Sequence, residues 1–306
     1  MKKLVLNLIN PVKLLKAYRY KRSCPKYDRA TSDLELKLYA QILKNDMLHW
    51  GYFEDTEVLP ESISIAGMEQ AQWLYAEKIA AQLPKDCANV LDVGCGMGGL
   101  AQMLLQKGIT PDLLTPNRKQ KTYVQQKFPA LKVHHCRYEE LANETRFDAV
   151  INAESLQYID LDKAFDKTAS ILKEGGRWII TDYFRLHGEG KSKSGHLMDT
   201  FRAKIASHGW QLVAEKDITP NVLPTIRLVD LYARRFLLPL TDFGIAKLHS
   251  KKPFWWYLAQ DSIAGIKGKI DREMSAVDPD LFEKEKKYMM FVIRKLKIED
   301  DHIPAG

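Results

Sequence analysis

The sequence predicts an α/β protein, in which a mostly parallel sheet has helices on both faces. Two observations support this. From residue 89 onward, short apolar runs typical of strands alternate with segments whose apolar residues recur at helical spacing. Such alternation produces parallel strands joined by crossover helices. In addition, the run LDVGCGMGGL, residues 91–100, places a glycine-rich loop between a strand and a helix, as nucleotide-binding folds do.

The part of the chain before this loop is predicted to be helical. Residues 32–46 carry apolar side chains at helical spacing behind a capping serine, and residues 66–83 do so up to Pro84. A helical cap over residues 31–86 therefore precedes the sheet.

The elements of the sheet follow in order along the chain. Gly108, Pro129 and the pair Gly175 and Gly176 mark ends of segments, because glycine and proline interrupt regular structure. Strands are expected at residues 89–93, 112–115, 131–136, 147–153, 177–184, 211–219 and 285–297, and helices at 99–108, 117–128, 160–173 and 197–210.

A long helical insertion is expected between the last two strands. The sheet does not need it, so it is a candidate lid or substrate module. It contains four consecutive aromatic residues, of which helix packing accounts for about two. The expected divisions are a basic amphipathic segment 1–30, a helical cap 31–86, a core 87–220, the insertion 221–282, and a final strand with tail 283–306.

Charge is concentrated at the amino terminus. Residues 1–30 hold nine basic residues against one acid, Asp28, a net charge of +8, whereas the whole chain carries +7. A general nucleic-acid binder spreads basic residues over its folded domain, so nucleic acid is not expected as a partner. Two interpretations stay open, namely contact with an anionic membrane surface and a docked helix with solvated lysines. Oligomeric state is not predicted.

Cysteine usage and hydropathy indicate the compartment. The four cysteines are scattered without a C-x-x-C pair, which favours a reducing compartment and no metal site. No apolar run reaches the roughly 20 residues of a spanning helix. The amino-terminal apolar run is too short for a signal peptide. We therefore expect a cytoplasmic protein, with peripheral contact at the inner membrane surface as the open alternative.

The glycine-rich loop satisfies two incompatible signatures. Gly94, Gly96 and Gly99 give G-x-G-x-x-G, the dinucleotide fingerprint, and Asp112 stands about where its ribose-binding acid belongs. With Asp92 and Gly98 the same loop gives D-x-G-x-G-x-G, the form used for S-adenosylmethionine. The loop alone leaves both cofactors open.

Taken together, the motifs VLDVGCGMGGL, FDAVINAESLQYI and ILKEGGRWIITD resemble those of class I S-adenosylmethionine-dependent methyltransferases. The resemblance implies a Rossmann-like sheet, S-adenosyl-L-methionine as cofactor and methyl transfer. Because NAES stands where DNA and protein amide methyltransferases have Asp/Asn-Pro-Pro-Tyr/Phe, methylation of such amides is disfavoured. The alternatives are an NAD-dependent oxidoreductase and a catalytically silent adenosyl-binding subunit.

A narrower resemblance covers the flanks of the core. MLHWGYFED, residues 47–55, and KDITPNVLPTIR, residues 216–227, are similar to segments of the tocopherol and related lipid methyltransferases. This similarity implies a small, lipophilic substrate such as an isoprenoid, a polyketide or a lipid head group.

The resemblance assigns the cofactor site to the loop and the strands beside it. Gly94, Gly96 and Gly98 allow close backbone approach, and Asp92 accepts hydrogen bonds from the loop or, through water, from the methionine ammonium. The helix after the loop favours a carboxylate at its amino end. Cys95 belongs to the loop as a small residue that packs.

The ribose and adenine segments depart from the family pattern. Leu113 stands where the ribose acid belongs, so either a bulge turns Asp112 inward or Thr115 and Asn117 hold the ribose. Near the adenine, Tyr138 offers its backbone N–H and Glu139 or Glu140 an acceptor, and a solvated loop is the open alternative. Asn152, at the end of the fourth strand, completes the expected cofactor-binding residues.

Three residues are expected to be catalytic. Glu154 borders the reacting methyl group and either holds a substrate hydroxyl or amine or stabilises a developing cation. Tyr158 follows it closely. His49 is the leading candidate for a general base, although it could equally well pack the helical cap. His196 lies in a polar loop and is expected to be solvated.

Overall fold

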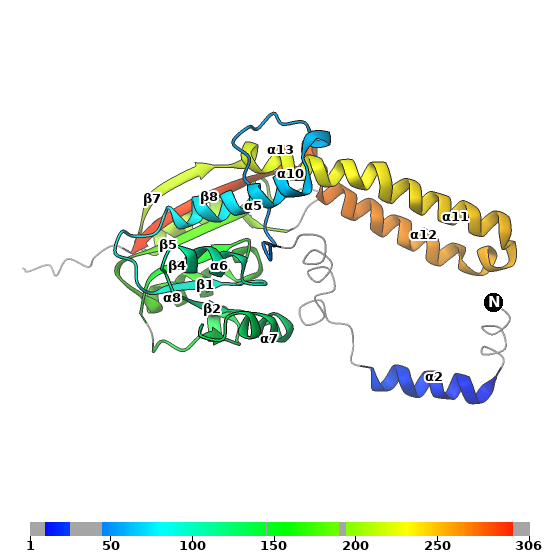
Figure 1. The fold of residues 1–306 in the computed structure, drawn as a ribbon, viewed down its shortest axis with the longest axis horizontal. Helices are drawn as coiled ribbons and strands as arrows, with labels where there is room; N and C mark the ends of the chain where they lie inside the picture. Colours follow the sequence, from blue (N-terminus) through cyan, green and yellow to red (C-terminus); the bar gives the residue numbers. More distant parts are fainter. Residues whose placement is uncertain (1–9, 25–44, 145, 190–193, 296–306) are drawn as a thin grey trace, which may run out of the picture.

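The computed structural model describes residues 10–24, 45–144, 146–189 and 194–295, and shows a sheet with helices on both faces (Figure 1). Strand order within the described residues is β3-β2-β1-β4-β5-β8-β7, with β6 beside β5. The predicted fold class is confirmed. The helix predicted at 32–46 lies outside the described residues except for its last two positions.

The strands are parallel from β3 to β5, and β8 runs antiparallel between β5 and β7. Every residue of β1 is buried, because helices cover both faces of a parallel sheet. The bounds are β1 Val90–Val93, β2 Pro111–Leu114, β3 Val133–His134, β4 Phe147–Ala153, β5 Leu172–Arg185, β6 His196–Leu197, β7 Trp210–Asp217 and β8 Lys286–Lys295.

Two strand predictions need correction. β5 begins at Leu172, before the predicted residue 177, so the Gly175–Gly176 pair lies inside the strand. β6 was not predicted at all. Its His196, expected in solvent, is half-buried, and its Nε2 lies 2.9 Å from the carbonyl oxygen of Leu156. A two-residue strand has no period that a sequence could show.

Helices cover the sheet and extend beyond it. Within the described residues they are α2 Pro11–Ser23, α5 Ile65–Ala80, α6 Gly99–Gln106, α7 Arg118–Lys127, α8 Leu161–Ile171, α9 Met198–Ser207, α10 Thr219–Tyr232, α11 Leu238–Lys251, α12 Pro253–Ala276 and α13 Pro279–Glu285, with short turns η1 Pro60–Ser62, η2 Tyr138–Glu140, η3 Leu156–Tyr158 and a π-helical turn η4 Ala233–Leu237. No described helix is long and apolar enough to cross a bilayer.

The two faces of the sheet carry different cores. An aromatic cluster packs beneath α8 and α9, where Phe165 contacts Trp178 edge-on at 5.1 Å and Trp210 at 6.2 Å between ring centroids. On the opposite face, aliphatic residues from α5, α6 and α10 pack on the strands, together with the buried rings of Tyr75 and Tyr288. Polar side chains of the candidate site arise on this second face.

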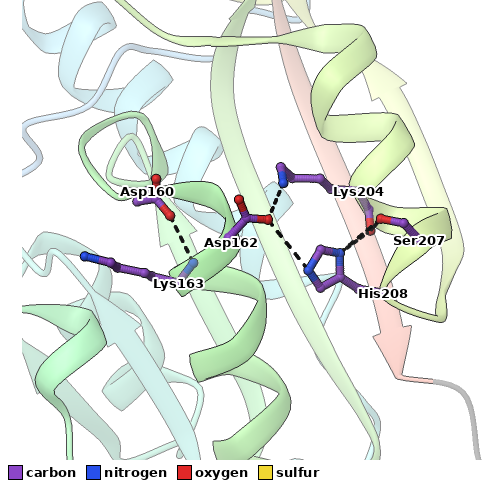
Figure 2. A network of polar contacts seen from close by, with 6 residues as sticks. All are labelled: Asp160, Asp162, Lys163, Lys204, Ser207 and His208. Atoms are coloured by element: carbon purple, nitrogen blue, oxygen red, sulfur yellow. Dashed lines mark hydrogen bonds and ion pairs between the residues drawn. The ribbon is translucent and has the colours of Figure 1, made fainter.

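Surface contacts join α8 to α9 (Figure 2). Asp162 pairs with Lys204 and lies 3.8 Å from Nε2 of His208, whose ring stacks on Phe165. Asp160 caps α8 by accepting from the backbone N–H of Lys163 at 3.1 Å. Such exposed pairs add little stability, and we do not treat this surface network as a candidate site.

Residues 45–53, called the strap from here on, cross over the glycine loop. The buried side chain of Gln72 on α5 fixes this segment. Its Nε2 donates to the carbonyl oxygens of Met47 at 2.8 Å and His49 at 2.7 Å, and its Oε1 accepts from Asn45 at 3.0 Å. A single glutamine thus satisfies three polar groups of a segment without regular structure.

The insertion divides into two parts. α10 and α13 pack against the sheet, whereas α11 and α12 pair with each other and project away from it (Figure 1). No residue of α11 is buried. The sheet therefore does not depend on α11 and α12.

We predict that Gln72→Leu destabilises the fold by roughly 1–3 kcal/mol, because two buried carbonyl groups lose their donor. Urea unfolding measures the loss. Gln70→Leu on the exposed side of the same helix is the matched control and should change stability by less than about 0.5 kcal/mol. Equal effects of the two substitutions would show that Gln72 does not fix the strap.

Candidate functional site

Three glycines shape the loop after β1. Gly94, Gly96 and Gly98 have φ values of 77°, 55° and 83°, a region that residues with a Cβ rarely adopt. At Gly94 an added Cβ would also lie 2.6 Å from Cβ of Ser155. The N–H groups of Gly94 and Cys95 donate to the carbonyl oxygen of Leu114, which fixes the loop against the end of β2.

The loop leaves polar groups without partners among the described residues. α6 begins at Gly99 behind Gly98, and no side chain caps its first N–H groups. Oδ2 of the buried Asp92 has no hydrogen-bond partner there. Burial raises the pKa of Asp92 to about 7. An acceptor and a set of helix donors therefore lie within one short loop.

The strap closes over this loop. Leu48 lies 3.2 Å from where a Cβ on Gly96 would stand, and the carbonyl oxygen of Asp46 lies 2.7 Å from where a Cβ on Gly99 would stand. The Asp46 carboxylate pairs with Lys127 of α7 at 2.6 Å and accepts from the Tyr123 hydroxyl at 2.9 Å. Small residues in the loop thus serve close packing as well as any ligand.

Cys95 contributes no side chain to the loop surface. Its buried thiol packs with Ala101, Leu113 and Val124, and burial raises its pKa above the usual range. Only its backbone could reach a ligand.

Asp112 is not turned inward as the sequence analysis allowed. β1 and β2 pair without a register shift, so no bulge is present. The Asp112 carboxylate instead lies 2.8 Å from Nε2 of His134 and 3.7 Å from Nζ of Lys132. The neighbouring Leu113 is buried in the core.

The other two ribose candidates form the start of α7. Oδ1 of Asn117 accepts from the backbone N–H groups of Lys119 and Gln120, as a helix cap does. The buried Thr115 hydroxyl lies 2.6 Å from Oε1 of Gln120 and accepts from the Asn117 N–H. Both candidates lie where β2 ends, but their side chains already hold the local backbone.

Tyr138, Glu139 and Asn152 are placed differently. The Tyr138 hydroxyl is buried against Thr168 at 2.7 Å, so only its backbone is open to a ligand. Glu139 is half-buried on η2. Asn152 is fully buried. Its side-chain amide accepts a hydrogen bond from Trp178 at 2.8 Å and donates one to Ser155 at 2.8 Å. Its role in this structure is to hold Ser155 against the glycine loop.

Glu154 is the centre of the polar cluster at the end of β4. It has a φ of 56°, which a residue other than glycine rarely adopts. Its Oε1 accepts from the backbone N–H of Trp50 at 2.9 Å and from the hydroxyl of Tyr288 at 2.6 Å. The Tyr288 hydroxyl also lies 2.8 Å from that of Tyr75. We call these four residues the Glu154 cluster.

The environment of this cluster changes its titration. Burial is the main cause that raises the pKa of Glu154 to about 8, although its two donors act in the opposite direction. Burial and the charge of Glu154 raise the pKa values of Tyr75 and Tyr288 as well. Near neutral pH the Glu154 carboxyl is therefore poised between its acid and its base form.

His49 contacts the cluster but is bound on both sides. Its Nδ1 donates to the carbonyl oxygen of Trp50 at 2.9 Å, and its Nε2 faces the Met47 sulfur at 3.2 Å. Its ring stacks on Tyr75 at 4.2 Å. Burial lowers the pKa of His49 to about 4. These contacts favour packing over general-base action.

Tyr158 lies on η3 and is 82% exposed, outside the cluster.

A second group of polar residues follows on β5 and β8. The buried Asp182 accepts from the N–H groups of Gln157 at 3.0 Å and of Tyr183 at 2.9 Å. Burial raises the pKa of Asp182 to about 7 and lowers that of Lys286 to about 8. Lys286 lies 4.2 Å above the ring of Tyr183, whose hydroxyl donates to Gln157.

Sequence reasoning missed Tyr75, Tyr288 and Lys286. Tyr75 stands in an apolar helix face and Tyr288 in an apolar strand, where each is expected as core. Only the insertion of β8 beside β5 brings Tyr288 to Glu154. A signal was present nonetheless, because a buried tyrosine hydroxyl requires a polar partner.

Two surface hollows among the described residues lie away from the glycine loop. One of about 360 Å³ lies on α7 and is lined by Arg118, Lys121, Thr122, Gln125, Gln126 and His135. The other, of about 480 Å³, lies at the base of the insertion and is lined by Pro60, Arg227, Asp230, Leu231, Arg234, Arg235 and Pro279. We assign the site by the loop and its partners, because neither hollow contains the cluster.

Comparison with known proteins agrees with this geometry. Residues 90–176 match a family model described as a methyltransferase domain. The fold is that of a class I methyltransferase. The match confirms the predicted enzyme class over its own segment, which includes β1, the glycine loop and Glu154. No curated protein matches this sequence.

Solved structures share this methyltransferase fold at low sequence identity. Geranyl diphosphate C-methyltransferase from Streptomyces coelicolor, solved with S-adenosyl-L-homocysteine, is 17% identical with a TM-score of 0.60, and the match covers 91% of this chain and 96% of that one. A cyclopropane synthase from Mycobacterium tuberculosis is 14% identical with a TM-score of 0.61, over 85% and 95%. The 4+2 cyclase SpnF is 17% identical with a TM-score of 0.59, over 87% and 96%.

We predict that Glu154→Gln stabilises the fold increasingly as pH rises. A carboxyl with a folded pKa near 8 and an unfolded pKa near 4.5 binds its proton more tightly when folded. The folded state is therefore penalised progressively between pH 4.5 and 8, by at most about 1.4 kcal/mol per pH unit. Glutamine keeps the acceptor oxygen and removes the penalty.

Chemical unfolding of the parent and of Glu154→Gln at pH 5 and pH 8 measures the difference. Glu61→Gln, at an exposed position of η1, is the control and should show none. A parent and Glu154→Gln pair with the same pH dependence would contradict the raised pKa.

Proposed function

We propose that this protein is an S-adenosyl-L-methionine-dependent methyltransferase that acts on a small, lipophilic molecule. The observation that carries the proposal is the glycine loop, where the unpartnered carboxylate oxygen of Asp92 and the uncapped start of α6 lie together. An ammonium group suits the first and a carboxylate suits the second. The methionine end of the cofactor has both groups, whereas NAD has neither in this arrangement.

The residues present fit this cofactor at its methionine end. Gly94 and Gly96 keep the loop backbone open to it, and a side chain at either position would also press on Ser155 or Leu48. For the ribose and adenine we propose Thr115, the start of α7, and the backbone of Tyr138 with Glu139. No acid at the end of β2 takes the ribose, since Asp112 is paired with His134. We expect a weaker ribose contact than in enzymes that have this acid.

When bound, the cofactor supplies an electrophilic methyl group on a sulfonium, and the protein's task is to align the acceptor with it. Glu154 is the group we propose for contact with the substrate. Below pH 8 its protonated form can donate a hydrogen bond to a substrate oxygen. Its ionised form can accept a proton or stabilise a developing cation. Tyr288 donates to Glu154 and holds its position.

The lipophilic substrate is supported by two kinds of similarity. The flanking segments resemble lipid methyltransferases, and the solved neighbours include a geranyl diphosphate methyltransferase and a cyclopropane synthase. One of these neighbours is a cyclase, which has a different chemistry on the same fold. The fold alone therefore does not identify the substrate. Incubation with a labelled methyl donor and a cell lipid extract tests whether the substrate is a lipid. If no label enters the extract, the result would favour an adenosyl-binding subunit without catalytic activity.

We predict that Gly96→Ala weakens S-adenosylmethionine binding on the order of tenfold or more. Its Cβ would enter the loop 3.2 Å from Leu48 at a φ of 55°. Gly108→Ala is the matched control, because Gly108 also has a positive φ, of 77°, but has nothing within 4 Å of the added Cβ. Both variants bear the same kind of backbone strain, roughly 1–2 kcal/mol. Only Gly96 adjoins the proposed site.

Calorimetric titration of parent and variants with S-adenosylmethionine and with NADH measures the effect. Equal affinity in both variants would refute the assigned loop. Tighter binding of NADH than of S-adenosylmethionine by the parent would favour an oxidoreductase instead.

We further propose that the amino-terminal segment contacts an anionic membrane surface. α2 carries Lys13, Lys16, Arg19, Lys21 and Arg22 and no acid. None of its residues is buried. Exposed apolar side chains stand among these charges, at Val12, Leu14, Leu15, Tyr18 and Tyr20. A basic amphipathic helix of this kind suits a lipid headgroup layer.

We predict that removing residues 1–22 reduces co-sedimentation with vesicles that contain phosphatidylserine, because each basic residue near the surface adds about 1 kcal/mol. Turnover of a water-soluble substrate should stay nearly unchanged, and raised salt should imitate the truncation. A truncated protein that unfolds or loses cofactor binding would identify the segment as a structural cap.

A further inference from the structure

The paired helices α11 and α12 expose large apolar side chains that no described part of the protein covers. Leu240, Phe243, Phe254, Tyr257 and Leu258 are each 62–72% exposed. They lie on α11 and α12, which project away from the sheet (Figure 1, yellow and orange). Isolated exposed apolar residues are ordinary, whereas several within two adjoining helices indicate an interaction surface.

The outer side of α11 changes from apolar to basic toward its end. Leu240, Phe243, Lys247 and Lys251 recur at intervals of three and four residues, so they share one stripe of the helix. All four are exposed. α11 and α12 pack against each other, and several of their half-buried apolar residues lie on a different stripe of each helix, namely Leu238, Ile245, Leu248, Trp256, Ala259 and Ile263.

The charge near the connection of the two helices has one sign. Residues 243–260 contain Lys247, Lys251 and Lys252 and no aspartate or glutamate. The same stretch holds the aromatic run from Phe254 to Tyr257, in which Phe254 and Tyr257 are exposed. Aromatic rings settle at the level of lipid headgroups, and lysine extends its charge toward water or phosphate from there.

We propose that residues 243–258 dock on an anionic lipid bilayer. In this arrangement Phe254, Tyr257 and Leu258 enter the headgroup layer, and the three lysines contact anionic lipid headgroups. A second copy of the chain is a poorer occupant, because a symmetric contact would bring the same lysines together. The docking surface needs neither turnover nor cofactor, so it can fail while the proposed methyl transfer stands, and the reverse.

Charge and apolar contributions are separated by two variants of the full-length protein. One carries Lys247→Gln, Lys251→Gln and Lys252→Gln, and the other carries Phe254→Ser and Leu258→Ser. The matched control replaces three exposed lysines of the main body, Lys85→Gln, Lys107→Gln and Lys163→Gln. It removes the same net charge from a different surface.

The measurement is co-sedimentation with phosphatidylcholine vesicles that contain phosphatidylserine. We expect each variant of the projecting helices to lose on the order of tenfold or more in apparent affinity, and the control to lose far less. Thermal unfolding checks that every variant is folded. Equal losses in the lysine variant and its control would attribute binding to net charge and overturn the proposal. So would unchanged binding in both variants, which would assign the membrane contact to the amino-terminal segment.

A second readout locates the contact directly. Trp255 and Trp256 are half-buried and belong to the proposed docking segment, with Trp256 against His249 of α11, whereas Trp178 and Trp210 are buried in the core. Brominated lipid should quench part of the tryptophan fluorescence, and Trp255→Phe with Trp256→Phe should abolish that part. Absence of quenching while the protein is bound would overturn the proposal. A change of sedimentation mass in the Phe254→Ser and Leu258→Ser variant without vesicles would identify the surface as a contact between copies instead.

Discussion

The carboxylate of Glu154 joins three segments that are far apart in the sequence. It stands at the end of β4, accepts from the backbone of Trp50 in the strap and accepts from Tyr288 on β8. The strap thus has a bond to the sheet through Glu154, in addition to those that Gln72 makes from α5. The strained backbone of Glu154 is held by its own N–H, which donates to the carbonyl oxygen of Thr181 at 2.8 Å. One carboxyl group thus links β4, β8 and the strap.

The fold could be predicted from the sequence because its signals are local. Alternating apolar runs, the glycine loop and helix ends all lie within a few residues, and the structure has them nearly as expected. The position of β8 between β5 and β7 is different, since no local signal says which strands are neighbours. In the sequence Tyr288 therefore resembles any other core residue of a strand. In the structure it contacts Glu154, the site residue with a positive φ.

Site residues were predictable only where backbone geometry requires them. The positive φ angles of Gly94 and Gly96 explain why glycine stands there, and the motif finds them. Asp112 and His49 were expected from residue type and position alone. Each finds a local partner that the sequence does not reveal, His134 for Asp112 and the carbonyl oxygen of Trp50 for His49. Partners across strands depend on which face a side chain takes, and a single residue of offset decides that face.

The place of the insertion has a consequence for how such proteins diverge. α10 begins where β7 ends, and α13 ends where β8 begins, so both ends of the insertion are fixed to adjacent antiparallel strands. Between them, α11 and α12 can lengthen, shorten or change composition without moving a strand. Changes in α11 and α12 can therefore alter where such a protein binds in the cell or which substrates it accepts. The sheet and the glycine loop stay the same.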